Sequence, residues 1–396
     1  MQNFVNRQIS PHCMLSCLYF LLLPTTIAVN SAGNSILKLA TIPIGLFFVV
    51  TLILSDRKLQ INGVHLALLL YTLCAVATLF CNANAGSVDS VIGYVLNAAI
   101  YICLTVIPYN QAELELMEKI QILLLAILNA LVLFSNGSEA ERSTIMIMGQ
   151  ISDPNYLIGF FIFPLTVVLK RMVSGRHSFF YLLLIALSLY CVFLSGSRGG
   201  MLAVMVTFIG FTLIYPSGFV KRVLFLVGGV VLILILWIVC RPILPESVVE
   251  RMSVKAVVES GGTGRMEIWG AMLREIVDQP EKLLLGRGIN ARHRLFVNGQ
   301  WSGVAAHNQV IQILYNQGLV GLCSFLLLTG ISFFRCVHRR KIVSVAILGM
   351  MALSVSLSFN QTTRTFWNLI AYAALAFPDS DSNTISNGGL SDYERT

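Results

Sequence analysis

The chain has 396 residues; 56% of them are hydrophobic, only 12% are charged, and the mean hydropathy is +0.78. Soluble domains carry about 25% charged residues, so this composition excludes an ordinary soluble protein and predicts an integral membrane protein. The net charge of +8 invites a nucleic-acid-binding function, but most Lys and Arg lie in short loops between apolar runs, where they set topology, and we expect no nucleic-acid partner.

About twelve apolar runs are long enough to cross a bilayer core about 30 Å thick. We predict an all-α polytopic protein with spans near residues 13–29, 36–54, 62–81, 89–107, 118–135, 154–170, 178–195, 199–215, 221–240, 307–334, 342–359 and 365–378. The first run is taken as a span, with a cleaved signal peptide as the alternative. The expected organisation is a membrane domain at 1–240, a large polar loop at 241–306, three further spans within 307–378 and a polar cytoplasmic tail at 379–396.

The Lys and Arg residues predict which loops are cytoplasmic. With the N-terminus inside, the cytoplasmic connections carry most of them: Arg57, Lys58, Lys170, Arg171, Arg176, Lys221, Arg222, Arg335, Arg339, Arg340 and Lys341. The short outer connections carry only Arg142, Arg198 and Arg364. Lys38 lies beside the first outer connection, between the first and second spans. Nine spans before the large loop then place that loop outside, and both chain ends inside.

The large loop has its own helical patterns. Ser247-Val-Val-Glu250 matches a capping box and predicts a short amphipathic helix to about Val258, which Gly261, Gly262 and Gly264 end. A second helix is predicted from Arg265 to about Val277, with Met266, Trp269, Leu273 and Ile276 on one face. These apolar faces need cover, so we expect the loop to act as a lid on the outer ends of the spans.

Arg198 is the first candidate functional residue. It lies in Ser195-Gly-Ser-Arg-Gly-Gly200, where a tight hairpin between two spans explains the Gly and Ser residues but not the Arg. A cation at the bilayer rim, next to a helix N-terminus, favours an anionic ligand. We therefore predict that Arg198 binds phosphate.

Two glycine-bounded segments of the loop carry further arginines. Gly261-Gly-Thr-Gly-Arg265 lacks the G-K-[ST] of a nucleotide-binding loop, so it is interpreted either as a flexible joint that presents Arg265 or as a structural break. Gly286-Arg-Gly288 presents Arg287 in a similar way and makes it a candidate substrate-binding residue.

The segment from His307 to Asn316 ends the loop and opens the tenth predicted span. Asn308, Gln312 and Asn316 are spaced four residues apart and form one polar stripe, which either binds substrate or bonds to neighbouring helices. His307 lies at the helix mouth near water, where a neutral imidazole accepts a proton near neutral pH. It is the candidate catalytic base.

Two more segments carry polar or charged residues at the start of a predicted span. Asp153-Pro-Asn-Tyr156 is typical of a helix start, with Asp as the N-cap and Pro in the first turn, and is interpreted as structural. Arg364, at the outer start of the last span, is a further candidate for the anion-binding pocket. No H-E-x-x-H motif, acidic metal-binding cluster or G-x-S-x-G motif is present, so neither a metal nor a cofactor is expected.

Taken in order, these motifs resemble the O-antigen ligase and O-antigen polymerase family. The resemblance is densest from about Asp153 to Leu322 and rests on S-G-S-R-G-G, G-T-G-R, L-L-G-R-G-I (Leu284–Ile289) and the run from Ala306 to Leu322. It implies a C-type glycosyltransferase-like fold in the bacterial inner membrane. The family's essential arginines and histidine correspond by position to Arg198, Arg265 and His307.

The resemblance also implies the reaction. The donor would be a glycan linked to undecaprenyl diphosphate on the periplasmic face, and the acceptor a lipid-linked repeat unit (polymerase) or lipid A–core (ligase). Membrane lipids are expected partners, and a chain-length regulator is a possible one. The S-G-S-R-G-G and D-P-N-Y forms favour polymerisation of O-antigen or exopolysaccharide units. A polysaccharide transporter or flippase is the alternative from another class, although no internal repeat is seen.

Overall fold

The computed structural model describes residues 9–27, 36–81, 85–134, 137–139, 142–147, 150–175, 178–216, 218–253, 265–297, 300–359 and 363–375. The predicted Gly261–Gly264 joint and the polar tail therefore lie outside the described residues. Each of the twelve predicted spans coincides with a helix: α2 Pro11–Leu21, α3 Ile36–Ile53, α4 Gly63–Ala77, α5 Ala85–Thr105, α6 Gln111–Phe134, α7 Pro154–Val173, α8 Ser178–Leu194, α9 Arg198–Ile214, α10 Phe219–Cys240, α14 Gln309–Arg339, α15 Lys341–Leu353 and α16 Arg364–Ala374.

The fold is a mostly helical membrane bundle. Within the described residues, six of these helical segments are long and apolar enough to cross a membrane on their own, and the others are shorter, so the count of twelve spans stays a prediction. Helix α7 lies in the centre and packs against α8, α15, α6 and α9. Its residues 157–169 are all buried, as expected of a helix that is apolar on every side. Helix α10 lies at the periphery and exposes most of its Val, Leu and Ile side chains.

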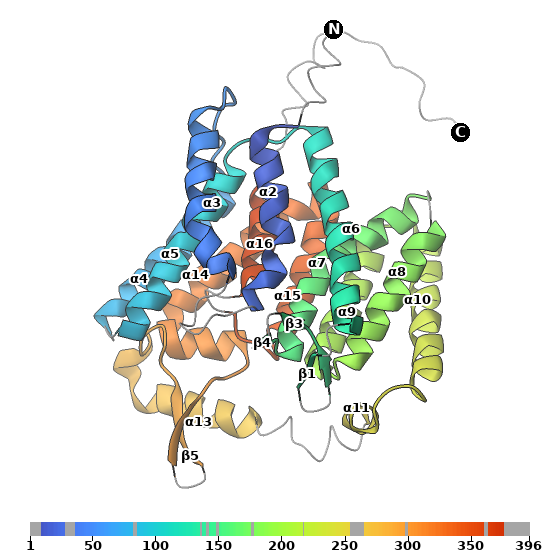
Figure 1. Ribbon diagram of the computed structural model, residues 1–396. Coiled ribbons are helices and arrows are strands. Elements are labelled where there is room, and N and C mark those ends of the chain that lie inside the picture. Colours follow the sequence, from blue (N-terminus) through green and yellow to red (C-terminus); the bar gives the residue numbers. More distant parts are fainter. Residues whose placement is uncertain are drawn as a thin grey trace.

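One end of the bundle carries the polar loop, and we call it the loop end. Figure 1 shows α11 (Glu246–Met252), α13 (Arg265–Asp278) and the hairpin of β5 (His293–Val297) and β6 (Gln300–Val304) grouped there. The short strands β1 (Gly137–Glu139), β2 (Arg142–Thr144), β3 (Met146–Ile147) and β4 (Gln150–Ile151) lie at the same end, before α7. These antiparallel hairpins were not predicted.

Salt bridges tie helices together at the opposite end of the bundle. The buried Glu113 carboxylate accepts from Arg57, at 2.7 Å, and from the backbone and hydroxyl of Ser10. Glu118 pairs with Lys170 at 2.5 Å and with Arg171 at 2.8 Å. Residues that the charge pattern predicts to be cytoplasmic thus lie together, which makes the predicted topology self-consistent.

The two loop helices differ in detail from the prediction. Helix α11 begins after Pro245 with no side-chain cap, so the predicted capping box at Ser247 is wrong, and the helix ends at Met252. Helix α13 starts at Arg265 as predicted and stops before Pro280. Its buried face, however, is turned from the predicted one: Met272 and Ile276 are buried, whereas Met266 and Leu273 are 62% and 41% exposed. The apolar positions of a short helix allow more than one face, and contact with α14 selects this one.

The tenth predicted span is not one continuous helix. Gly318 has φ 65° and ψ −164°, which breaks α14 into a first segment at 309–317 and a long segment after the break. The free backbone groups at the break bond to the loop instead. Leu319 N–H donates to Leu283 O at 2.8 Å, and Arg287 N–H donates to Tyr315 O at 3.0 Å. The polar first segment therefore belongs to the loop end rather than to a span.

The two glycines at this junction are required by the close approach of two backbones. Gly286 (φ 72°) and Gly318 both have positive φ, and a Cβ at either would overlap backbone atoms of the other segment. We therefore expect Gly318→Ala to lower stability by about 1–3 kcal/mol or more, because a left-handed non-Gly residue alone costs that much. Thermal unfolding of the purified protein measures this. Gly330→Ala is the matched control, since it lies in the same helix with nothing within 4 Å, and a large loss there too would contradict the explanation.

Helix α16 is shorter than predicted. It spans Arg364–Ala374, about 16 Å long, and the residues before it at 354–359 are not helical. That irregular segment is held by α14: Gln309 N–H donates to Ser354 O at 2.8 Å, and the Gln309 side chain accepts from Phe359 N–H. Backbone outside a helix is tolerated in a membrane protein where other parts of the protein cover it and bond to it, as Gln309 does here.

Candidate active site

The N-terminal ends of α7, α9, α14 and α16 converge at the loop end. The Ser197 hydroxyl, which caps α9 by accepting from Gly200 N–H, donates to Asn155 in the first turn of α7 at 2.6 Å. A Cβ at Gly199 would overlap Ser356, from the segment that leads to α16. The glycines of the S-G-S-R-G-G turn thus allow these ends to approach closely. Their dipoles all favour an anion on this side.

Four arginines gather beside these helix ends. Arg198 Nε donates to the backbone oxygen of Arg251 at 2.8 Å. Burial lowers the pKa of Arg251, and the neighbouring charges of Arg142, Arg198 and Arg265 lower it further. The pKa of Arg265 is likewise lowered, first by burial and then by Arg142, while Asp153 opposes this. We call Arg142, Arg198, Arg251 and Arg265 the arginine group.

Arg251 is the member of the arginine group whose surroundings favour an anionic partner. Its Nε atom is buried and, among the described residues, has no hydrogen-bond partner. A buried charged donor left unpaired costs more than a neutral one, so native structures normally satisfy it. An anion bound between these arginines would both supply the missing acceptor and relieve the repulsion between the guanidinium groups.

Asp153 is the acidic residue that faces the arginine group. It caps α7 by accepting from Asn155 N–H at 2.6 Å, which confirms the predicted helix start. Its charge also acts on Arg251, Arg265 and His307. Asp153 therefore does more than cap α7. It also lies at the edge of the candidate site, which the sequence did not predict. Asp153 thus sets a negative charge against the positive charges of the arginine group.

His307 is held rigidly beside the arginine group. Its φ of 48° is the only positive value at a non-glycine among the described residues. Both neighbours are fixed: Trp269 donates to Ala306 O at 2.7 Å, and the Asn308 side chain caps α14 by accepting from Val310 and Ile311 N–H. A left-handed conformation at such a residue persists only where the surroundings determine it, and it is typical of functional sites.

The imidazole of His307 is tuned toward its neutral form. It is exposed at the loop end, yet partial burial lowers its pKa below 6.5, and the charge of Arg265 lowers it further against the opposing effect of Asp153. A neutral imidazole is the form that accepts a proton. The structure thus places the three predicted catalytic residues, His307, Arg265 and Arg198, around one site.

Other predicted site residues make different contacts. Arg287 donates to Gln279 and to the backbone of Glu275, both at 2.6 Å, and lies 5.1 Å from the Tyr315 ring centre. These contacts hold α13 against α14, so Arg287 does not join the arginine group. Arg364 is buried in α16 and donates to the Tyr19 hydroxyl at 3.3 Å.

The predicted polar stripe mainly supports backbone. Asn308 is the N-cap of α14, Gln312 accepts from Ala306 N–H at 2.8 Å and donates to Asn316 at 3.0 Å, and Asn316 donates to Ile289 O at 2.7 Å. These contacts are with the loop and within α14 itself, so they are neither contacts with substrate nor the predicted bonds to neighbouring helices. The stripe positions the loop on either side of His307.

Sequence reasoning missed Arg251 and Arg142 as site residues. Arg142 had been used only for topology, and Arg251 had no glycine or helix start beside it. A signal was nevertheless present: Arg251 lies in the last turn of the short loop helix, four residues after Ser247 and so on the same helix face. Only the packing of α11 on the S-G-S-R-G-G turn, where Val248 lies against Gly196, shows which face that is.

Comparison with known proteins agrees with the resemblance read from the motifs. Residues 183–326 match the family model described as O-antigen ligase, a range that includes Arg198, Arg251, Arg265 and His307. No curated protein matches the chain. The family implies a glycosyltransferase-like enzyme with lipid-linked glycan and acceptor substrates. With its several apolar helices the chain is a multi-pass membrane protein, and its residues 183–326 are similar to the O-antigen ligase family.

Proposed function

We propose that the protein transfers a glycan from undecaprenyl diphosphate to an acceptor sugar hydroxyl at the loop end, on the periplasmic face of the bacterial inner membrane. The observation that carries this proposal is the arginine group next to the exposed His307, with an Arg251 Nε that has no hydrogen-bond partner among the described residues. A diphosphate suits such a site because the planar guanidinium fork matches its oxygens.

The proposed chemistry uses few groups. The acceptor oxygen attacks the anomeric carbon, and the bond from that carbon to the diphosphate oxygen breaks, with its electron pair leaving on the diphosphate. Arg198, Arg251 and Arg265 stabilise this anion, so it needs no proton. His307 takes the proton of the acceptor hydroxyl. In-line attack inverts the anomeric centre.

Transfer is expected to continue without a divalent metal, because arginines supply the charge that a metal would otherwise supply. The described residues contain no group of three or more His, Cys, Asp or Glu placed to hold a metal ion. The measurement is product formation by the purified protein in excess EDTA, compared with added Mg²⁺ or Mn²⁺. Equal rates are expected, and a strict requirement for either ion would contradict the metal-free mechanism.

Polymerisation of repeat units is the favoured form of this reaction, and ligation to lipid A–core is the alternative. Both use the same donor and could use the same residues. The lipopolysaccharide of a deletion strain separates them: core carrying a single repeat unit indicates a lost polymerase, whereas polymer accumulating on the lipid carrier indicates a lost ligase.

A transporter or flippase is the second alternative, and the broken helix α14 is a feature that such proteins also have. Here, however, the groups freed at Gly318 and the turn before it are bonded to residues 283–288 of the loop. The arginine group also lies at helix ends rather than midway along them. With the protein in liposomes, we expect glycan elongation. Movement of labelled lipid across the bilayer without elongation would overturn the proposal that the protein is an enzyme.

A further inference from the structure

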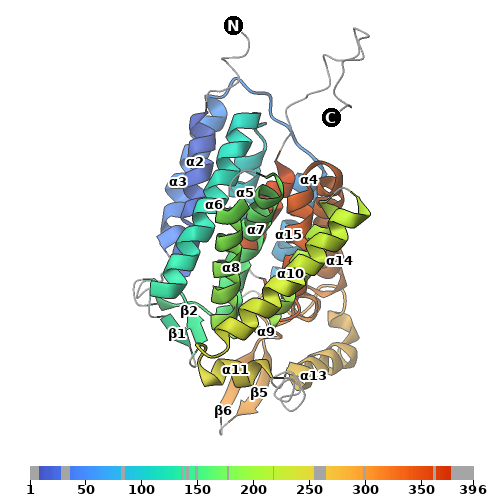
Figure 2. The same ribbon diagram turned by 90° about the vertical axis from the view of Figure 1, so that its right-hand side faces the viewer.

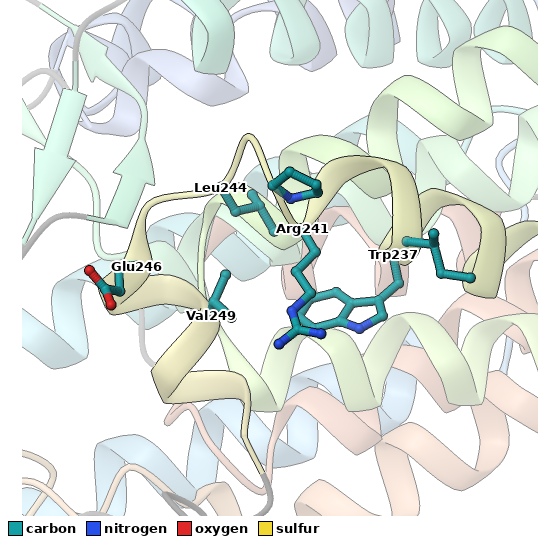
Figure 3. Close-up of a pocket in the computed structure, with 7 residues that line it drawn as sticks. Trp237, Arg241, Leu244, Glu246 and Val249 are labelled. Atoms are coloured by element: carbon teal, nitrogen blue, oxygen red, sulfur yellow. The ribbon is translucent and has the colours of Figure 1, made fainter.

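A pocket of about 630 Å³ lies between the loop-end terminus of α10 and helix α11. Its lining combines apolar and charged side chains: Trp237, Ile238, Arg241, Pro242, Leu244, Glu246 and Val249. Figure 3 shows Trp237 and Arg241 extending to the same side of α10, as expected of residues one turn apart, while the Glu246 carboxylate points away from them. This pocket is separate from the arginine group.

The pocket opens on the most lipid-exposed helix of the bundle. Leu234, Ile235 and Ile238 are 53%, 52% and 69% exposed and form an apolar face that ends at the pocket. Figure 2 shows α10 on the outside of the bundle, with α11 next to its end. A Trp and an Arg at the end of such a face lie at the level of lipid headgroups.

Arg241 makes the pocket selective for an anion. Its side chain is exposed and, within the described part of the chain, makes no hydrogen bond or ion pair. Favourable interaction with the C-terminal dipole of α10 explains a cation here but not the pocket beside it. A phosphate on Arg241 with an acyl chain along Ile238 and Leu234 would match both the charge and the apolar face.

We propose that this pocket binds an anionic phospholipid of the surrounding leaflet, and that the lipid braces α11. Helix α11 connects the pocket to the arginine group. Val249 lines the pocket, Val248 lies against Gly196, and the backbone oxygen of Arg251 accepts from Arg198. An occupied pocket therefore holds the arginine group in place from the membrane side. The bound lipid is a structural ligand and takes no part in the transfer.

Native mass spectrometry of the full-length protein in detergent, titrated with phosphatidylglycerol, tests this directly. We expect the wild type to bind it and Arg241→Ala to bind it about fivefold more weakly, the loss typical of one basic residue at a membrane surface. Arg241→Lys should stay close to wild type. Arg274→Ala is the matched control, because Arg274 is exposed on α13 and away from the pocket, and should bind as the wild type does.

Three results would overturn the proposal: equal binding by Arg241→Ala, equal binding of phosphatidylcholine by the wild type, or displacement of the phospholipid by undecaprenyl diphosphate. The last result would make the pocket part of the donor site. Lipid binding is measured without glycan transfer, so its failure is distinguishable from failure of the proposed enzymatic function.

Discussion

Replacement of His307 by alanine is expected to lower the turnover number for glycan transfer by about 10²–10⁴-fold, the usual contribution of a general base. The donor should still bind, because the arginine group is unchanged. The measurement is the rate of product formation by purified protein with a lipid-diphosphate donor. His338→Ala is the control, since His338 is exposed on α14 beyond the break and outside the site. Full activity in His307→Ala would contradict the role of His307 as the catalytic base.

The same residue predicts the pH dependence. Because burial and Arg265 hold the pKa of His307 below 6.5, the imidazole is neutral at pH 7. Activity should therefore be constant near neutrality and fall only as the pH drops through this lowered pKa, where His307 becomes protonated. Asp153→Asn removes the charge that raises the pKa, so the acid limb should move to lower pH; movement to higher pH would contradict the assigned neighbours.

Replacement of Arg251 by alanine is expected to lower kcat/KM by about 10–10²-fold, since a hydrogen bond to a charged group contributes about 1.5–3 kcal/mol. Arg251→Lys should recover only part of this, because an ammonium group cannot form the two parallel bonds of the guanidinium fork. Steady-state kinetics over a range of donor concentrations measures both.

Arg287→Ala is the informative control for the arginine group. Its guanidinium binds Gln279, Glu275 and the Tyr315 ring, so its loss should lower the unfolding temperature while folded protein keeps its activity. Were Arg287→Ala to lose transfer at unchanged stability, and Arg251→Ala to keep it, the assignment of the two residues would be reversed.

The positions of the membrane helices could be predicted because a long apolar run is recognisable from its own residues alone. The long apolar runs identified every helix of the bundle, and Pro280 and the start at Arg265 fixed the limits of α13. What escaped prediction depends on contacts between distant segments. The break at Gly318 is visible only once residues 283–288 are known to lie against it. Before that, Gly318 is one glycine in an apolar run.

The same distinction, between local sequence and contacts of distant segments, applies to the candidate site. Arg198, Arg265 and His307 could be found because each lies at a helix start, where a polar residue is conspicuous in an apolar sequence. Arg251 could not, since its role depends on how α11 packs against the turn at Gly196. Arg287 and Arg364 were predicted from their local sequence, and in the structure they bond to the Glu275 backbone and to the Tyr19 hydroxyl.

The central claim is that the arginine group binds the diphosphate while His307 serves the acceptor. Binding of undecaprenyl diphosphate to purified wild type, Arg251→Ala, Arg265→Ala and His307→Ala tests it most directly, with undecaprenol as the uncharged comparison. The predicted result is weak binding in both arginine variants and wild-type binding in His307→Ala, which nevertheless forms product about 10²–10⁴-fold more slowly. Wild-type binding in the arginine variants, or loss of binding in His307→Ala, would contradict this division of roles.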